Sequence, residues 1–188
     1  MAKKGFKVGL DPVKIYRHAS AFHKAYDVLL KAALPKEGAI PDDQFIGIIA
    51  HPAMVLSLFA SELYLKCLLC VETGEVPEGH NLKTLFLGLP VPTRHALDGL
   101  WDTDMRRMEK QKALEKLQEM DTKKRLRLDL RYALDLGADS FIKLRYFYEK
   151  EEVFCLLSDF PFVLRNFILD RFPSWGSILP KASKGLIH

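Results

Sequence analysis

The sequence predicts an all-α protein, a bundle of five or six helices. Apolar residues recur every three or four positions in several long segments, and capping residues, prolines or glycines bound these segments. No segment shows the convincing alternation of a half-buried strand. The 188 residues, 48% hydrophobic and 28% charged, fit one soluble globular domain over 1–188 with irregular ends at 1–10 and 173–188.

The first helix is expected to start after Asp11, which caps it, with Pro12 in the first helical position. Its apolar face continues to about Leu34. The next segment, 44–73, is almost continuously apolar, and it reads as the most buried helix of the protein. We expect a break or kink at Pro52, because proline disfavours helical geometry in the residue before it.

A left-handed Gly74 is expected to end this helix, followed by a loop over 75–80. Asn81 is a good N-cap for a short amphipathic helix over 82–89, which Pro90 ends. Two helices therefore meet through a short connection.

Three further helical segments are expected in the second half of the chain. Thr93 is expected to cap a helix that runs without interruption into the charged segment ending at Asp121. The pattern then continues over 122–149, with Gly137 as a bend. The last helix is expected to begin near 158–159.

The charge balance and the cysteines indicate the compartment and permit certain partners. A formal charge of +4 and a pI near 8.9 allow nucleic-acid or other anionic partners without requiring them. Cys67, Cys70 and Cys155 lie in apolar runs, as core thiols of a reducing cytosol do. No secretory signal and no uninterrupted apolar stretch of about 18 residues is recognised, so a cytoplasmic protein without membrane contact is expected.

Several classes of enzyme are excluded by missing motifs. The chain contains no Gly-rich phosphate-binding loop and no Ser-centred hydrolase elbow. A lone C-x-x-C pair and six histidines without ligand spacing do not predict a metal site. We therefore expect neither a metal nor a cofactor.

A basic segment between Arg106 and Arg131 holds ten cations and five anions. Such a stripe is able to follow a phosphate backbone. Carboxylates spaced to pair along the helix make an ordinary solvated surface the favoured interpretation, with a nucleic-acid groove as the alternative.

Two segments together resemble a known family. In 57–89, Glu62 and Lys66 interrupt an apolar helix, and after a loop His80 precedes the Asn81 cap. In 138–150, aromatic residues cluster around an arginine and a glutamate. This pairing, over about 53–149, resembles the HEPN family of small helical domains from toxin–antitoxin modules, phage-defence systems and nucleotidyltransferase partners.

The resemblance implies an up-and-down helical bundle that is commonly a homodimer and, in many members, cleaves RNA. We therefore expect a dimeric binding or regulatory protein whose partner is RNA, a nucleotide, or a protein such as a nucleotidyltransferase. The binding candidates are Lys66, His80, Lys83 and Arg145.

Ribonuclease members of that family carry an arginine followed four to six residues later by histidine. The late helices of this chain depart from that pattern, because no such histidine follows Arg145 or Arg165. Arg17 and His23, on the first helix, are the one arrangement with acceptable spacing. Cleavage requires a proton-transfer group and a cation, so a non-catalytic protein is favoured. The alternatives are a metal-independent endoribonuclease toxin using Arg17 and His23, and a protein-interaction scaffold without a nucleic-acid role.

Glu62 and Arg145 also have a structural interpretation. Each interrupts an apolar face, and a buried charge is tolerated only when it is paired. The simplest hypothesis is that these two side chains form an ion pair across the bundle and fix the register of its helices.

Overall fold

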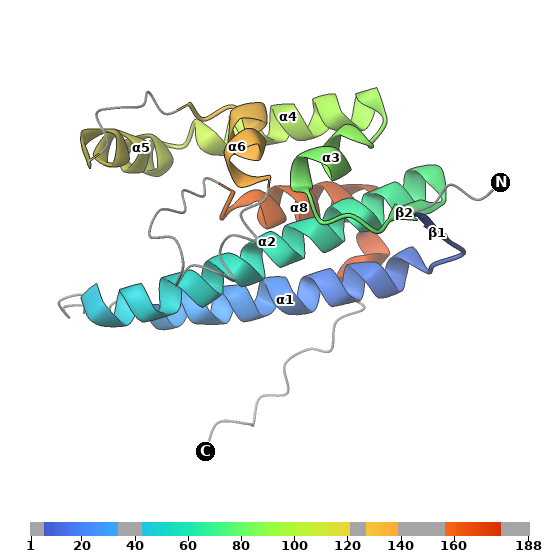
Figure 1. Ribbon diagram of the computed structural model, residues 1–188, viewed down its shortest axis with the longest axis horizontal. Coiled ribbons are helices and arrows are strands. Elements are labelled where there is room, and N and C mark those ends of the chain that lie inside the picture. Colours follow the sequence, from blue (N-terminus) through green and yellow to red (C-terminus); the bar gives the residue numbers. More distant parts are fainter. Residues whose placement is uncertain (1–5, 34–42, 121–126, 139–156, 178–188) are drawn as a thin grey trace, which may run out of the picture.

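A computed structural model of the chain describes residues 6–33, 43–120, 127–138 and 157–177 (Figure 1). The side chains at 33, 43–47, 113–114, 116–117 and 120 are not described. The described residues form seven α-helices, one 3-10 helix and two short strands. The predominantly helical character predicted from the sequence is confirmed, with more helices than the five or six expected.

Helices α1 (Pro12–Ala33) and α2 (Asp43–Thr73) make the most extensive contact between any two described elements. They lie side by side and run in opposite directions (Figure 1). The Asp11 carboxylate accepts a hydrogen bond from the Val13 amide at 2.9 Å, which confirms the predicted start of α1.

A break or kink was predicted at Pro52. The break is wrong, because α2 is continuous through this residue, while the kink stays a prediction. A proline inside a helix leaves the carbonyl four residues earlier without a donor. That carbonyl belongs to Ile48, which is 72% exposed, so water is able to satisfy it.

Helix α2 contains an apolar stretch of the kind that the sequence analysis did not recognise. Its part Ile48–Thr73 is long and apolar enough to cross a membrane by length and composition, with a mean hydropathy of 1.8. The hydropathy refers to an 18-residue window of this part, and about 61% of that window is buried within the protein, as in the central helix of a globular fold. Figure 1 shows α1 on one side of α2 and α3, α4 and α6 on the other.

A two-stranded ribbon replaces the loop expected over 75–80. Strand β1 (Phe6–Val8) pairs antiparallel with β2 (Glu75–Pro77), with Lys7 opposite Val76. Gly74, at a φ of 72°, ends α2 in the left-handed conformation as predicted and lets the chain turn back. The ribbon joins the start of α1 to the end of α2.

Helix α3 (Leu82–Leu87) begins as predicted, since the Asn81 side chain accepts a hydrogen bond from the Thr84 amide at 2.9 Å. Its buried side chains, Leu82, Leu85 and Phe86, pack into the main core. The cap and the apolar face together fix where the segment after the ribbon enters the fold.

The single long helix expected from Thr93 is two helices, α4 (Val91–Met105) and α5 (Met108–Met120). Thr93 is not the N-cap, because the helix starts earlier with a proline in its first turn. The Thr93 hydroxyl instead donates to the Glu72 carboxylate at 2.6 Å and connects α4 to α2. A turn at Arg106 and Arg107 separates the two helices.

Helix α6 (Leu130–Gly137) starts later than the expected 122–149 segment, because the Asp129 carboxylate caps it by accepting from the Tyr132 amide. The remainder of that segment, 139–149, lies outside the described residues. Helix α8 (Phe160–Arg171) begins as predicted, and the 3-10 helix η2 (Pro173–Ser177) follows it.

One continuous core lies where α2 and α8 meet α4 and α6. Trp101, fully buried on α4, donates from Nε1 to the Leu128 carbonyl at 2.6 Å. Its ring meets that of Phe160 edge-on at 5.7 Å. The indole therefore connects α4, the segment before α6 and the start of α8.

Gly137 provides a test of this packing. A Cβ at this position would lie 2.4 Å from Cδ1 of Leu157, a fully buried side chain that would have to shift. We expect Gly137→Ala to lower the free energy of unfolding by about 1–2 kcal/mol, measured by denaturant unfolding. Gly99→Ala, on α4, meets no atom within 4 Å and should be neutral or stabilising. Equal effects of the two substitutions would contradict this packing.

Candidate functional site

The buried carboxylate of Glu62 organises a polar cluster on α2. Glu62 is 1% exposed, although it carries a charge. Its Oε1 accepts from Lys66 Nζ at 2.9 Å, one helical turn along α2. The same Oε1 lies 2.9 Å from His80 Nδ1, on the segment between β2 and α3. The turn after the ribbon therefore brings His80 back over the middle of α2.

This arrangement fixes which nitrogen of His80 holds a proton. A carboxylate oxygen only accepts hydrogen bonds, so Nδ1 of His80 donates to Glu62. The other ring nitrogen is left for a ligand, and the side chain is 54% exposed. Among the described residues, Oε2 of Glu62 has no hydrogen-bond partner although it is buried. The Glu62 carboxylate therefore binds both Lys66 and His80 through one oxygen, Oε1.

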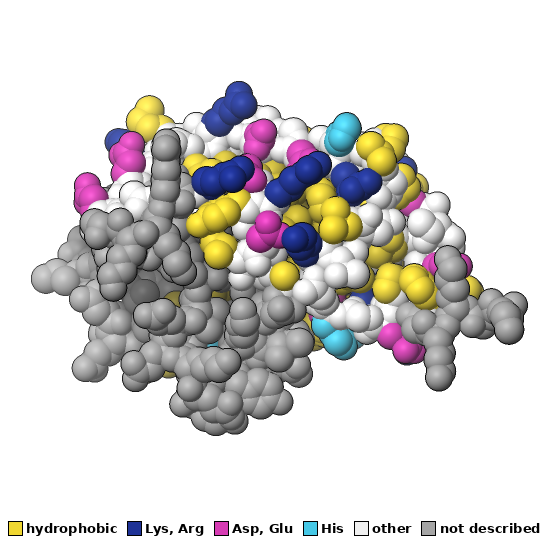
Figure 2. Space-filling view, turned by 45° about the horizontal axis from the view of Figure 1, so that its top comes forward, with side chains coloured by type: hydrophobic (Ala, Val, Ile, Leu, Met, Phe, Trp, Pro, Cys, Tyr) yellow, Lys and Arg dark blue, Asp and Glu magenta, His cyan; other side chains and the backbone are white. Residues whose placement is uncertain are grey.

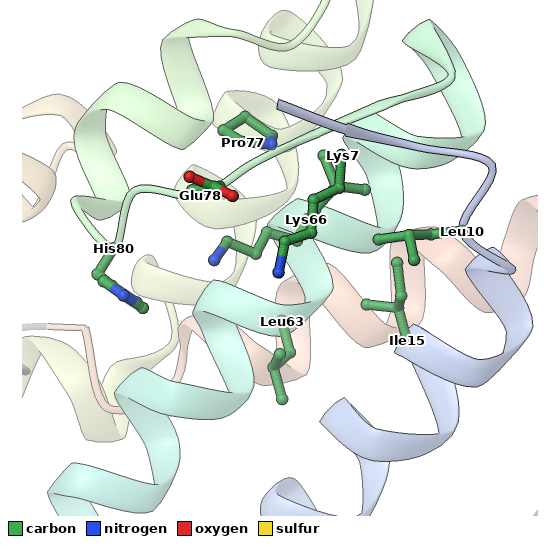
Figure 3. Close-up of a pocket in the computed structure, with 9 residues that line it drawn as sticks. Lys7, Leu10, Ile15, Leu63, Lys66, Pro77, Glu78 and His80 are labelled. Carbon is green, nitrogen blue, oxygen red and sulfur yellow. The ribbon is translucent and has the colours of Figure 1, made fainter. Parts of the chain in front are cut away.

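Lys66 and His80 border a pocket of about 360 Å³ between the ribbon and the first turns of α1 (Figure 3). This volume lies within the range of roughly 300–1,000 Å³ that small-ligand sites occupy. Lys7, from β1, reaches toward the same space. The remaining lining is mostly apolar, with one carboxylate: Leu10, Ile15, Leu63, Val76, Pro77 and Glu78.

The structure thus brings two of the four predicted binding residues together, Lys66 and His80. Lys83 does not line this pocket; it pairs with Asp135 at 2.5 Å, with both side chains about half exposed. Arg145 lies outside the described residues, and so does the predicted Glu62–Arg145 pair. Sequence reasoning missed Lys7, because only the pairing of β1 with β2 brings it here.

The two predicted catalytic residues do not come together on α1. Six positions along a helix correspond to roughly 240° of rotation, so such side chains lie on different faces. Arg17 is exposed, whereas His23 is 3% exposed and faces α2 and α8. The described cations that line the same pocket as His23 are instead Lys24 of α1 and Arg165 of α8. The spacing between Arg17 and His23 along α1 gave no signal that Arg165, on another helix, would line the pocket of His23.

The described part of the basic stripe is partly neutralised. Arg107 and Lys110 both pair with Asp104, and Lys110 also lies 3.0 Å from Asp159. Several lysine and arginine side chains are interspersed with carboxylates on the face shown in Figure 2. These contacts favour the solvated-surface interpretation over a continuous phosphate-binding groove.

Cys67 and Cys70 are buried free thiols, as a pair of core cysteines should be. Their sulfurs contact the carbonyls of Pro12 and Leu10 at 3.4 and 3.3 Å. Burial raises the pKa of Cys67 to about 12, with smaller contributions from Cys70 and Asp11. Such thiols are poor nucleophiles at neutral pH.

Within the described ranges, no group of three histidine, cysteine or acidic side chains is placed to hold a metal ion. Comparison of the chain with family models, with curated proteins and with solved structures finds no match.

Proposed function

We propose that this protein is a HEPN-like, dimeric and cytoplasmic binding protein that holds a nucleotide of single-stranded RNA in the pocket beside Lys66 and His80. In this proposal the protein is non-catalytic and regulates its target in a defence or toxin–antitoxin setting. The resemblance of segments 57–89 and 138–150 supports the family, the bundle layout and the dimer.

The observation that carries the proposal is the attachment of Lys66 and His80 to one oxygen of Glu62, each at 2.9 Å. Fixing both side chains before a ligand arrives reduces the entropy cost of binding. A nucleotide combines an anionic phosphate with an apolar ring face. Lys7 and Lys66 offer positive charge to the phosphate, while the apolar walls offer contact to the base.

Binding is favoured over cleavage for a geometric reason. Cleavage at the ribose hydroxyl needs a proton-transfer group and a cation that act on the same phosphate. Arg17, exposed on α1, does not line the pocket that contains His23. The pair Arg17 and His23 is therefore not assembled within one described chain. Arg165 does line the pocket of His23, but burial lowers the pKa of this histidine to about 4, too low for efficient proton transfer at neutral pH.

The proposal is tested by fluorescence anisotropy with a labelled single-stranded RNA. His80→Ala and Lys7→Ala should each weaken binding about tenfold, as the loss of one charge-assisted contact does. Lys31→Ala is the matched control, since Lys31 is exposed in the last turn of α1, away from the pocket. Affinity should also fall steeply as salt is raised.

Wild-type affinity in both pocket variants would contradict the proposal. A loss confined to Lys112→Ala, an exposed position on α5, would move RNA binding to the basic stripe. Cleavage of the RNA by the purified protein would replace the binding function with the endoribonuclease alternative.

A further inference from the structure

A second pocket, of about 260 Å³, lies between α1 and α8 and shares no lining residue with the first. Its lining is mostly polar and charged, unlike the apolar walls of the first pocket. The residues that line it are Ser20, His23, Lys24, Asp27, Phe162 and Arg165.

His23 lines this pocket and has an unsatisfied ring nitrogen. Its Nδ1 lies 3.4 Å from the Tyr64 hydroxyl, which is itself 3.0 Å from the Ser20 hydroxyl. Its Nε2 is buried and has no hydrogen-bond partner among the described residues. The nearest carboxylate oxygen, on Asp27, is 3.9 Å away, too far for a hydrogen bond. A ligand atom in the pocket would satisfy this nitrogen.

The hydroxyl contacts allow His23 to present a donor. The Tyr64 hydroxyl is able to donate to Nδ1 while it accepts from Ser20. The proton of the neutral ring then resides on Nε2, on the side of the Asp27 carboxylate. In that tautomer the buried nitrogen needs an acceptor, and an anionic oxygen is the strongest one.

Two cations stand beside this donor. Arg165 and Lys24 make no ion pair or hydrogen bond within the part of the chain that the structure describes, unlike the cations of the basic stripe that share Asp104. Asp27 is the single carboxylate in the lining. The lining thus has one more positive than negative charge while His23 is neutral.

We propose that this pocket is an oxyanion site for a phosphate ester, with Arg165 and Lys24 opposing its charge and His23 Nε2 donating to one of its oxygens. Three donors from separate side chains suit the several oxygens of a phosphate better than the two oxygens of a carboxylate. The exposed ring of Phe162, which meets the His23 ring edge-on at 4.5 Å, offers a wall for the organic part of the ester.

Binding at this site is coupled to protonation of His23. Burial lowers the pKa of His23 to about 4, while Asp27 raises it and Arg165 lowers it further. Burial likewise raises the pKa of Tyr64, so its hydroxyl stays protonated. A bound phosphate adds negative charge on the side of Nε2 and favours the imidazolium. Phosphate binding should therefore raise the pKa of His23.

The test follows the imidazole signals of the full chain by NMR during pH titrations with inorganic phosphate, and with chloride at matched ionic strength. Phosphate, but not chloride, should raise the pKa of His23 by about one unit, a tenfold coupling. Arg165→Gln, a partly exposed position, should weaken phosphate binding about tenfold and remove this shift. Arg94→Gln, on α4, is the matched control.

Three outcomes would overturn the site: no change at His23 with phosphate, the same change with chloride, or an unchanged response in Arg165→Gln. The signals of His80 report the other pocket in the same spectra. If phosphate leaves the His23 signals unchanged while RNA changes the His80 signals, this second site is ruled out and the proposed function is retained.

Discussion

Lys66→Leu is expected to lower the free energy of unfolding by about 3 kcal/mol, because it leaves the buried Glu62 carboxylate without its ammonium partner. The two groups are only 12% and 2% exposed, so solvent screens them little. His80 still donates to Glu62 in this variant, which places the loss at the lower end of the usual range for a broken buried pair. Denaturant unfolding at neutral pH measures the change.

Two controls separate this effect from a general loss of lysine. Lys83→Leu removes a half-exposed ion pair with Asp135 and should change stability by less than about 1 kcal/mol. The double substitution Glu62→Leu with Lys66→Leu should recover much of the lost stability, since no charge stays buried. Equal stabilities of Lys66→Leu and Lys83→Leu would show that Glu62 does not depend on its lysine.

Lowering the pH from about 6.5 to about 4 is expected to cost the fold about 3 kcal/mol through His23 alone. Burial is the main reason that its pKa is near 4 in the folded chain, against 6.5 for the free side chain. Between these values the unfolded chain binds a proton that the folded chain does not, so stability decreases as the pH falls. Below about 4 both states are protonated and the loss is complete.

The measurement compares unfolding free energies of the wild-type protein and His23→Gln across that range of pH. Glutamine does not titrate, so any excess in unfolding free energy of the wild-type protein over His23→Gln should shrink as the pH falls. If glutamine fits the site well, His23→Gln becomes the more stable of the two at low pH. His95→Gln, an exposed position on α4, should retain the wild-type slope. If the unfolding free energy of His23→Gln decreased with falling pH as steeply as that of the wild-type protein, His23 would not be the buried, neutral group that causes the loss.

The parts of the fold that could be predicted are those specified by local chemistry. Asp11 and Asn81 cap helices through contacts two and three residues away, and Gly74 ends one through its own backbone conformation. The ribbon was missed because its three-residue strands come from distant parts of the chain. The turn between α4 and α5 was missed because the residues around Arg106 suit a helix equally well.

The same distinction applies to the candidate sites. Lys66 and His80 were predicted as binding residues from segment 57–89, which carries the resemblance; their contacts with Glu62 were not predicted, and the structure brings all three together. Lys7 and Arg165 were missed as neighbours of these pockets because only tertiary packing brings them there. Arg145 stays a prediction, since it lies outside the described residues.

The most direct test of the central claim is NMR of the imidazole signals during titration with a short single-stranded RNA. The account predicts that the His80 signals change in proportion to bound RNA, while those of the exposed His95 on α4 do not. RNA binding that leaves His80 unchanged, or no binding even at low salt, would contradict a nucleotide site beside Lys66 and His80.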